Sequence, residues 1–273
     1  MAVTTASVKD TAKQLSARMR DHNTTLVAAG VAFYAFLAFV PALIAFISVY
    51  GLVASPSDVA SLVNNIGSAL PKEVQNFLAF QLTSIVNDKT SSVSLTLLVA
   101  IVIALWSASG GMASLITGLH VAHELDEPKS FVTKRAKALG LTLGAVVFLC
   151  IVVFLITALP PLVSGAGDVG RVGIEILRWP ILAVVMVGGI GLLYRYSTDE
   201  RTPAWLGVVT TGSVVATVGW LIVSALFAVY AANFASYSKT YGALASIVVI
   251  LLWIWLSSLL VLIGAEFDAA NTA

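Results

Sequence analysis

The chain has 273 residues, of which 59% are hydrophobic and only 11% are charged, whereas about 25% of the residues in a soluble domain are charged. So few charges cannot cover the surface of an ordinary soluble protein of this length, and a net charge of +1 gives no support to a nucleic-acid partner. The charged residues lie almost wholly between long apolar runs, which predicts an all-α, multi-pass membrane protein with one membrane domain over residues 26–268. The single cysteine, Cys150, lies inside such a run and excludes a disulfide framework.

Residues 1–25 are polar and basic, and we predict that they form a cytoplasmic N-terminal segment. Apolar residues at helical spacing favour an amphipathic helix on the membrane surface, although a solvated tail fits the composition equally well. The first apolar run, 26–54, is too long for the core of a cleavable signal peptide and predicts a first span. Pro41 lies near its middle and is expected to bend the helix. Such a bend either lines a pathway or only shapes packing.

The connection after the first span carries two amphipathic stripes between residues 57 and 88. Neither stripe is long or apolar enough to cross a bilayer. We therefore predict an external amphipathic helical hairpin, which either gates the outer mouth or only packs against the bundle.

The second span is predicted at 92–119, and its centre is rich in small residues. Small residues allow another helix to approach closely, and adjacent glycines weaken a helix. This centre is therefore either a packing surface or a hinge that faces a polar cavity. The candidate pathway or hinge residues are Ser107, Ser109, Gly110 and Gly111 of this centre, together with Pro41 and Glu266.

A polar cluster of His120, His123 and Glu124 follows the second span, where the helix leaves the membrane. Its spacing differs from the HExxH pattern of zinc-binding helices, and no second group of ligands accompanies it. We predict a cytoplasmic polar cluster with no metal and no cofactor.

Four further spans are predicted at 138–162, 173–196, 203–234 and 241–266, followed by a tail at 269–273. Glu266 lies just inside the last span, where a carboxylate is costly unless it is paired or serves a cavity. The alternative is a helix-end charge at the lipid headgroups. Lys and Arg are in excess in the N-terminal segment and in alternate loops, which places both termini in the cytoplasm.

Three features together resemble the YihY/BrkB family of bacterial inner-membrane proteins, whose members were formerly labelled ribonuclease BN. They are the segment from Ala29 to Pro41, the Trp106–Gly111 core, and the closing pattern from Tyr241-Gly242 to Gly264-Ala265-Glu266. The resemblance covers nearly the whole chain. It implies a six-span inner-membrane protein with a virulence or serum-resistance label, and it implies no defined biochemical activity.

The favoured function is a transporter, exporter or lipid translocator of unknown substrate. No charged residue lies near the centre of any predicted span, so the substrate is expected to be a lipid or a neutral or amphipathic small molecule. A non-catalytic protein that organises or assembles the envelope is the alternative, and a homo-oligomer is left open in either case. We expect no enzyme and no ribonuclease, because RNA hydrolysis needs a metal-bound water or an acid–base pair together with basic residues for the phosphates.

Overall fold

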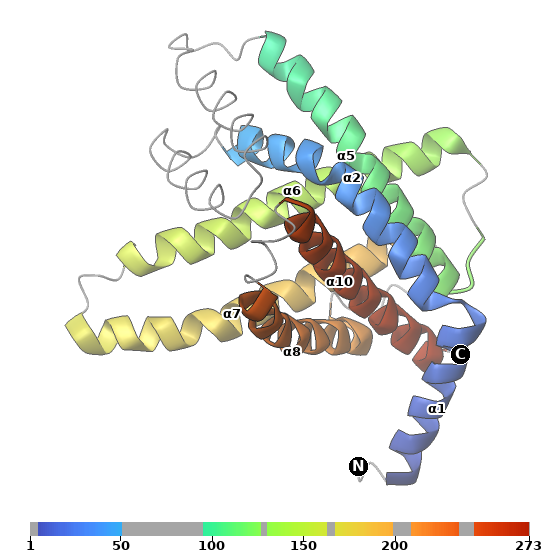
Figure 1. The fold of residues 1–273 in the computed structure, drawn as a ribbon. Coiled ribbons are helices and arrows are strands. Elements are labelled where there is room, and N and C mark those ends of the chain that lie inside the picture. Colours follow the sequence, from blue (N-terminus) through green and yellow to red (C-terminus); the bar gives the residue numbers. More distant parts are fainter. Residues whose placement is uncertain are drawn as a thin grey trace.

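The computed structural model describes residues 5–50, 95–126, 130–162, 167–198, 209–234 and 243–272. Within these ranges the chain forms helices and no strands, which confirms the all-α prediction. The predicted external hairpin at 57–88 lies outside the described ranges. The helices, shown in Figure 1, are α1 (Thr5–Asp21), α2 (Thr24–Tyr50), α5 (Leu95–Ala122), α6 (Phe131–Leu162), α7 (Gly167–Thr198), α8 (Thr211–Phe234) and α10 (Ala243–Thr272).

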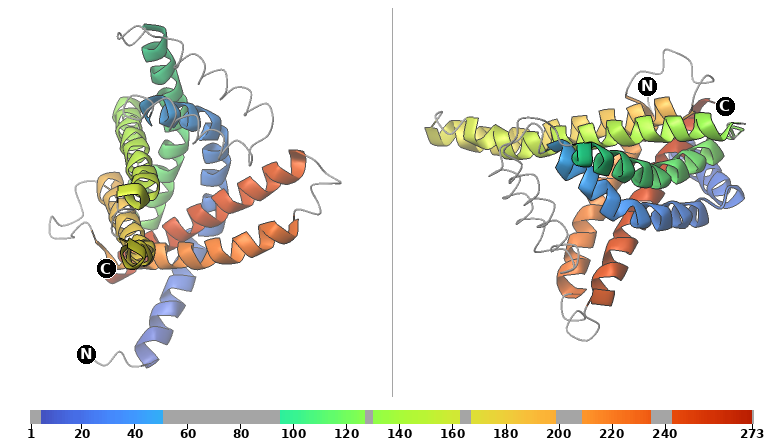
Figure 2. Two further views of the ribbon diagram at one scale, coloured as in Figure 1. Left: turned by 90° about the vertical axis from the view of Figure 1, so that its left-hand side faces the viewer. Right: turned by 90° about the horizontal axis from the view of Figure 1, so that it is seen from above.

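Each predicted span corresponds to one of the long helices, α2, α5, α6, α7, α8 and α10. The helices α6 and α10 continue past the apolar runs, since α6 begins at Phe131 and α10 ends at Thr272. Polar residues extend a helix readily once its apolar part has nucleated it. The segment α2 is one helix that contains Pro41, and it changes direction along its length (Figure 2), as a proline inside a helix is expected to cause.

Five of the described helices are long and apolar enough to cross a membrane, namely α5, α6, α7, α8 and α10. The count rises to six if α1 and α2, which are bent by 59° at the break between them, together form one broken span. The structure thus supports a multi-pass membrane protein, and the sixth span stays a prediction.

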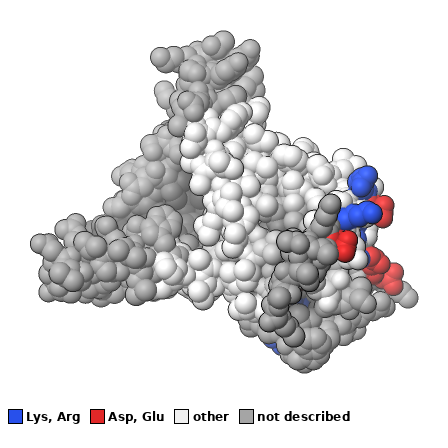
Figure 3. All heavy atoms as spheres, turned by 90° about the horizontal axis from the view of Figure 1, so that it is seen from below, with Lys and Arg blue, Asp and Glu red and all other residues white. Residues whose placement is uncertain are grey.

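Three antiparallel helix pairs, α2 with α5, α6 with α7 and α8 with α10, diverge from a common end of the molecule (Figures 1 and 2). The helix α1, the bend between α1 and α2, and the C-terminus of α10 lie at this end. Lys, Arg, Asp and Glu side chains of the described residues also gather on this side of the molecule in Figure 3. We call this common end the polar junction.

The buried core at the polar junction is built from small residues. Ala28, Ala122, Ala216 and Ala265 are almost fully buried there, beside Leu119 and Leu262. Along the diverging helices, in contrast, large apolar side chains are exposed on every helix from α2 to α10. A soluble protein does not expose so much apolar surface, whereas small residues at contacts and apolar residues outside are typical of helices in lipid.

Candidate functional site

The polar junction contains two buried carboxylates on the last turns of α10. The exposed fraction is 1% for Glu266 and 7% for Asp268. A buried carboxylate is strongly unfavourable unless it is paired and hydrogen-bonded, so the partners of these two residues define the candidate site.

Glu266 is held by three residues from the N-terminal part of the chain. The Nε of Arg18 donates to its Oε2 over 3.2 Å, and Nδ1 of His22 lies 2.7 Å from its Oε1. The Thr24 hydroxyl donates to the same Oε1 over 3.1 Å. Because a carboxylate only accepts hydrogen bonds, His22 must carry its proton on Nδ1 in this contact. The helix α1 is thereby attached to the end of α10.

Arg18 also joins this carboxylate to the end of α5. One terminal nitrogen lies 3.0 Å from Oε1 of Glu124, and the other donates to the carbonyl of Ala122 over 3.1 Å. The last carbonyls of a helix lack partners within it, so the guanidinium satisfies one of them. Arg18, His22, Thr24, Glu124 and Glu266 form what we call the Glu266 cluster, which links α1, α2, α5 and α10.

Glu124 reaches Arg18 from an unusual backbone conformation. Its φ is 54°, in the left-handed region that favours glycine. The amide of Leu125 bonds to the carbonyl of His120 and the amide of Glu124 to that of Val121, which is the Schellman pattern that ends a helix. A glutamate at this position costs about 1–2 kcal/mol of backbone strain relative to glycine.

The α1–α2 bend has a similar local cause. Asn23 has a φ of 49°, and asparagine tolerates this conformation better than most residues. Its carbonyl accepts hydrogen bonds from the amides of Leu26 and Val27, so Asn23 directly precedes α2 and accepts its first hydrogen bonds. This geometry directs both Arg18 and Thr24 at Glu266.

Asp268, the second buried carboxylate, holds the beginning of α8. Its Oδ1 accepts a hydrogen bond of 2.6 Å from the amide of Gly212 and one of 3.3 Å from the Thr211 hydroxyl. A carboxylate at a helix N-terminus satisfies free amides and the positive end of the helix dipole. Gly212 and Gly264 permit this approach, because a Cβ on Gly264 would lie 2.5 Å from the Gly212 carbonyl oxygen.

The two histidines of the predicted polar cluster contact different backbone carbonyls. Nε2 of His120 lies 2.9 Å from the carbonyl oxygen of Ser197 on α7, and Nδ1 of His123 lies 3.0 Å from that of Leu119. His120 is buried, and its Nδ1 has no hydrogen-bond partner among the described residues. Burial lowers the pKa of His123, while its hydrogen bond to Leu119 and the charges of Asp268 and Glu266 oppose that shift.

The other predicted pathway residues lie away from the Glu266 cluster. Residues 107–111 precede Glu124 along α5 by about 20 Å at 1.5 Å per residue, and Pro41 follows Thr24 on α2 by about 25 Å. The helix α5 is continuous through 107–111. A Cβ on Gly111 would lie 3.1 Å from Cα of Ala35 and from Cβ of Ala38, whereas one on Gly110 meets nothing within 4 Å.

The two serines of this segment differ in exposure. Ser109 is fully buried, and its hydroxyl donates to the carbonyl of Trp106 over 2.6 Å. Ser107 is exposed. The segment therefore packs α5 closely against α2 through Gly111, as the packing interpretation expects.

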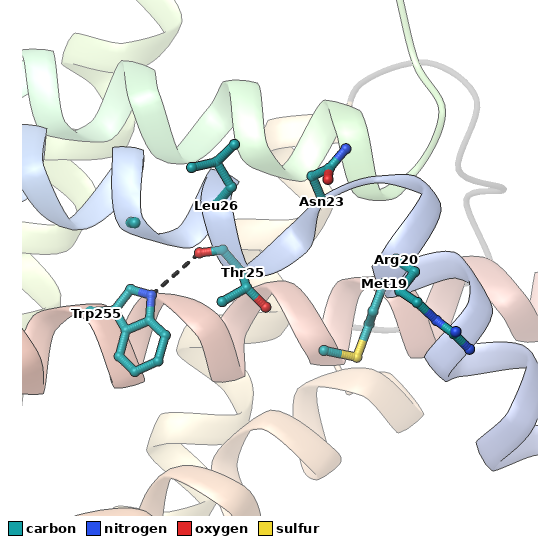
Figure 4. Close-up of a pocket in the computed structure, with 7 residues that line it drawn as sticks. Met19, Arg20, Asn23, Thr25, Leu26 and Trp255 are labelled. Atoms are coloured by element: carbon teal, nitrogen blue, oxygen red, sulfur yellow. Dashed lines mark hydrogen bonds between the residues drawn. The ribbon is translucent and has the colours of Figure 1, made fainter.

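An apolar cavity of about 300 Å³ lies between α5, α6 and α7. No charged residue is among those that line it: Met112, Leu141, Gly144, Ala145, Phe148, Met186, Gly189, Ile190, Leu192, Leu193 and Tyr196. Its walls do not include the residues predicted to line a pathway. A second, more open groove of about 510 Å³ lies at the α1–α2 bend against α10 (Figure 4).

Comparison with known proteins places the chain in a family. Residues 15–273 match the family described as Virulence factor BrkB. The chain belongs to the BrkB family. The resemblance predicted from the sequence is thus confirmed, and the BrkB match includes all five residues of the Glu266 cluster.

Curated relatives of this BrkB-family chain include a protein named as ribonuclease-like, YfkH of Bacillus subtilis (strain 168). It is 29% identical over 265 residues, which cover 94% of this chain and 93% of that protein. A UPF0761 membrane protein of Alteromonas mediterranea is 40% identical over 79 residues, covering 29% of this chain and 26% of that protein. A UPF0761 membrane protein of Aeromonas salmonicida is 36% identical over 106 residues, which cover 38% of this chain and 35% of that protein. No solved structure matches.

Sequence reasoning singled out Glu266 but missed the residues that hold it. Arg18 and His22 are spaced by one helical turn, and Thr24 lies two residues before the first apolar run. A spacing of four residues fits a shared helix face, yet nothing in the sequence identifies a carboxylate 242 residues or more away in the chain as the partner.

Proposed function

We propose that this BrkB-family chain transports, exports or translocates a lipid or another neutral or amphipathic molecule across the bacterial cytoplasmic membrane. The observation that carries the proposal is the apolar cavity between α5, α6 and α7, which has no charged residue in its lining. Ligand pockets typically have volumes of about 300–1,000 Å³, so the cavity accommodates a small apolar molecule or part of an acyl chain.

The proposed membrane placement uses all six long helices as spans. Charged side chains of the described residues gather at the polar junction (Figure 3), and the diverging helices expose apolar side chains. Lys137 lies at the junction, since its Nζ donates over 2.9 Å to the same Ser197 carbonyl that His120 contacts. Basic residues are enriched on the cytoplasmic side of membrane proteins, which supports a cytoplasmic location for the junction and for both termini.

The Glu266 cluster ties α1 to the ends of α5 and α10, and we propose that it forms the cytoplasmic gate. Arg18 contacts Glu266, Glu124 and the end of α5 at once, so access from the cytoplasmic side requires these contacts to break or α1 to move. A carrier needs one closed end at a time, and ion pairs that can exchange partners suit such a gate.

The cavity can be filled selectively at Gly144. A Cβ on Gly144 meets nothing within 4 Å, and Gly144 lines the cavity. Gly140 lies one turn earlier on α6, has the same open surroundings and does not line the cavity. Gly144→Leu and Gly140→Leu are therefore a matched pair.

We expect the purified protein in liposomes to move at least one member of a panel of lipids and apolar solutes above the rate of empty vesicles. Gly144→Leu is expected to lower that rate at least severalfold, and Gly140→Leu is expected to leave it near that of the wild type. Absence of movement with the wild type, or equal loss in both variants, would contradict the proposal.

A non-catalytic role in envelope assembly is the alternative function. It is favoured by the close contact of α8 with α10 at Gly212 and Gly264, because tightly packed helices suit a static scaffold. Cross-linking from single cysteines placed at residues 57–88 in whole cells separates the two functions, since a scaffold must yield a reproducible partner or a second copy of this chain.

We also propose that the chain is not a ribonuclease, binds no nucleic acid and needs no cofactor. His120 and His123, at the end of α5, both contact backbone carbonyls, and among the described residues no group of three or more His, Cys, Asp or Glu could hold a metal. Purified protein incubated with labelled RNA should leave it intact. Cleavage that His120→Ala or Glu124→Ala abolishes would contradict this.

A further inference from the structure

The open groove at the α1–α2 bend has two chemically different halves. Arg20 and Asn23 form its polar half, and Leu26, Ala29 and Trp255 form its apolar half, to which Thr25 adds one hydroxyl; Met19 completes the lining. Figure 4 shows Met19 and Arg20 together on one side and Trp255 of α10 on the other. The division follows the chain, because the polar helix α1 ends at Asp21 and the apolar helix α2 begins at Thr24.

The polar half offers a cation. The Arg20 side chain is exposed. Its guanidinium makes no hydrogen bond or ion pair with the described residues. Arg18, two residues earlier, is engaged by Glu266 and Glu124. Asp21 follows Arg20 directly, but it does not line the groove, since neighbouring residues on a helix do not face each other.

The apolar half matches an acyl chain. Leu26 is 72% exposed, although it lies at the first turn of an apolar helix. The indole N–H of Trp255 donates to the carbonyl of Thr25 over 3.3 Å, which fixes the ring with an apolar edge toward the groove.

We propose that this groove binds one anionic phospholipid, with its phosphate at the Arg20 guanidinium and an acyl chain along Leu26, Ala29 and Trp255. A free phosphate would use only the polar half and leave Leu26 exposed to water, whereas a phospholipid satisfies both halves. The cytoplasmic leaflet is rich in anionic lipids, which fits the proposed location of the junction. The site is separate from the apolar cavity and does not depend on transport.

Lipid at this groove would also stabilise the α1–α2 bend. Asn23 both lines the groove and has the left-handed conformation at the bend. The same bend brings Arg18 and Thr24 to Glu266. A bound phospholipid therefore favours the docked position of α1, with the Glu266 cluster closed.

The test is native mass spectrometry of the full-length protein in detergent, titrated with dioleoyl-phosphatidylglycerol or dioleoyl-phosphatidylcholine. We expect one tightly bound phosphatidylglycerol and weaker binding of phosphatidylcholine. Arg20→Gln should weaken phosphatidylglycerol binding about fivefold, the effect expected of one basic residue near an anionic headgroup. Arg20→Lys, which keeps the charge, should retain most of the affinity.

Two further variants separate this site from general electrostatic attraction and from a phosphate site. Lys13→Gln removes an exposed charge from the same helix outside the groove, and it should leave the affinity unchanged. Leu26→Asn should weaken phosphatidylglycerol binding by removing the acyl contact. Equal affinity for both lipids, equal loss in Arg20→Gln and Lys13→Gln, or full displacement by inorganic phosphate would overturn the proposal.

Discussion

The Nε of Arg18 lies 3.2 Å from Oε2 of Glu266, across 248 residues of sequence. The side chain of Glu266 is 1% exposed and that of Arg18 is 22% exposed, so solvent screens this pair far less than an ordinary surface salt bridge. The contact secures the N-terminal helix to the end of α10 and closes the polar junction.

Glu266→Ala should destabilise the protein strongly. It leaves the donors of Arg18, His22 and Thr24 at a buried position without their acceptor, and breaking one side of a buried pair costs about 3–5 kcal/mol. Thermal unfolding in detergent, followed by tryptophan fluorescence, measures the effect. The exposed Asp21→Asn on α1 is the control, with an expected change within about 0.5 kcal/mol.

Removal of both partners should cost less than the sum of the single effects. In the double variant Arg18→Ala with Glu266→Ala, no guanidinium remains without its carboxylate partner. We therefore expect the two changes to be coupled by about 0.5–3 kcal/mol. Strict additivity in the same unfolding measurement would show that the two groups do not interact.

Glu124→Gly and Glu124→Ala should have different effects on stability. Both remove the contact with Arg18, and because the Glu124 side chain is 63% exposed, this loss costs no more than about 1 kcal/mol. Only glycine relieves the strain of a φ of 54°, a gain of about 1 kcal/mol. The free energy of unfolding of Glu124→Gly should therefore exceed that of Glu124→Ala by about 1 kcal/mol, and the reverse order would contradict the Schellman geometry.

Alanine should be harmful at Gly264 and harmless at Gly110. At Gly264 the new methyl group would lie 2.5 Å from the Gly212 carbonyl oxygen and 2.8 Å from Cβ of Ala216, so α8 and α10 must separate, at a cost of about 1–3 kcal/mol. At Gly110 it meets nothing within 4 Å, and alanine favours the helix by up to about 1 kcal/mol. Detergent unfolding of the two variants checks this contrast.

The stability of the protein should fall as the pH drops below about 6.5 through His123. Burial lowers the folded-state pKa of His123 below its ordinary value of 6.5, so the unfolded chain binds a proton more readily in that window. The free energy of unfolding is then greatest above pH 6.5 and decreases down to the folded-state pKa. Below that pKa both states are protonated and the contribution of His123 is lost.

His123→Gln isolates this effect, because His22 and His120 are unchanged between the two proteins. The difference in melting temperature between the variant and the wild type should change as the pH falls below about 6.5, in the direction that favours the variant at low pH. A difference that is independent of pH would show that His123 does not carry this dependence.

Much of the fold could be predicted because apolar runs of about 20 residues have few alternatives to a helix in lipid. The same reasoning identified Glu266, since a carboxylate at the end of an apolar run needs a partner. Each predicted span corresponds to one described helix, although α6 and α10 begin or end several residues beyond the apolar runs, and the sixth span stays a prediction. Composition alone does not mark the point where a helix leaves the membrane.

The sequence by itself determined that this is an all-helical membrane protein of the BrkB family with one conspicuous carboxylate. Only the tertiary structure decided that Arg18 and His22 are the partners of Glu266, and that Gly111 packs on α2 while its neighbour Gly110 faces open space. The physical reason is that helix formation depends on local hydrogen bonds and apolarity. Partner choice depends instead on which helix faces meet, and one residue along a helix turns the side chain by about 100°.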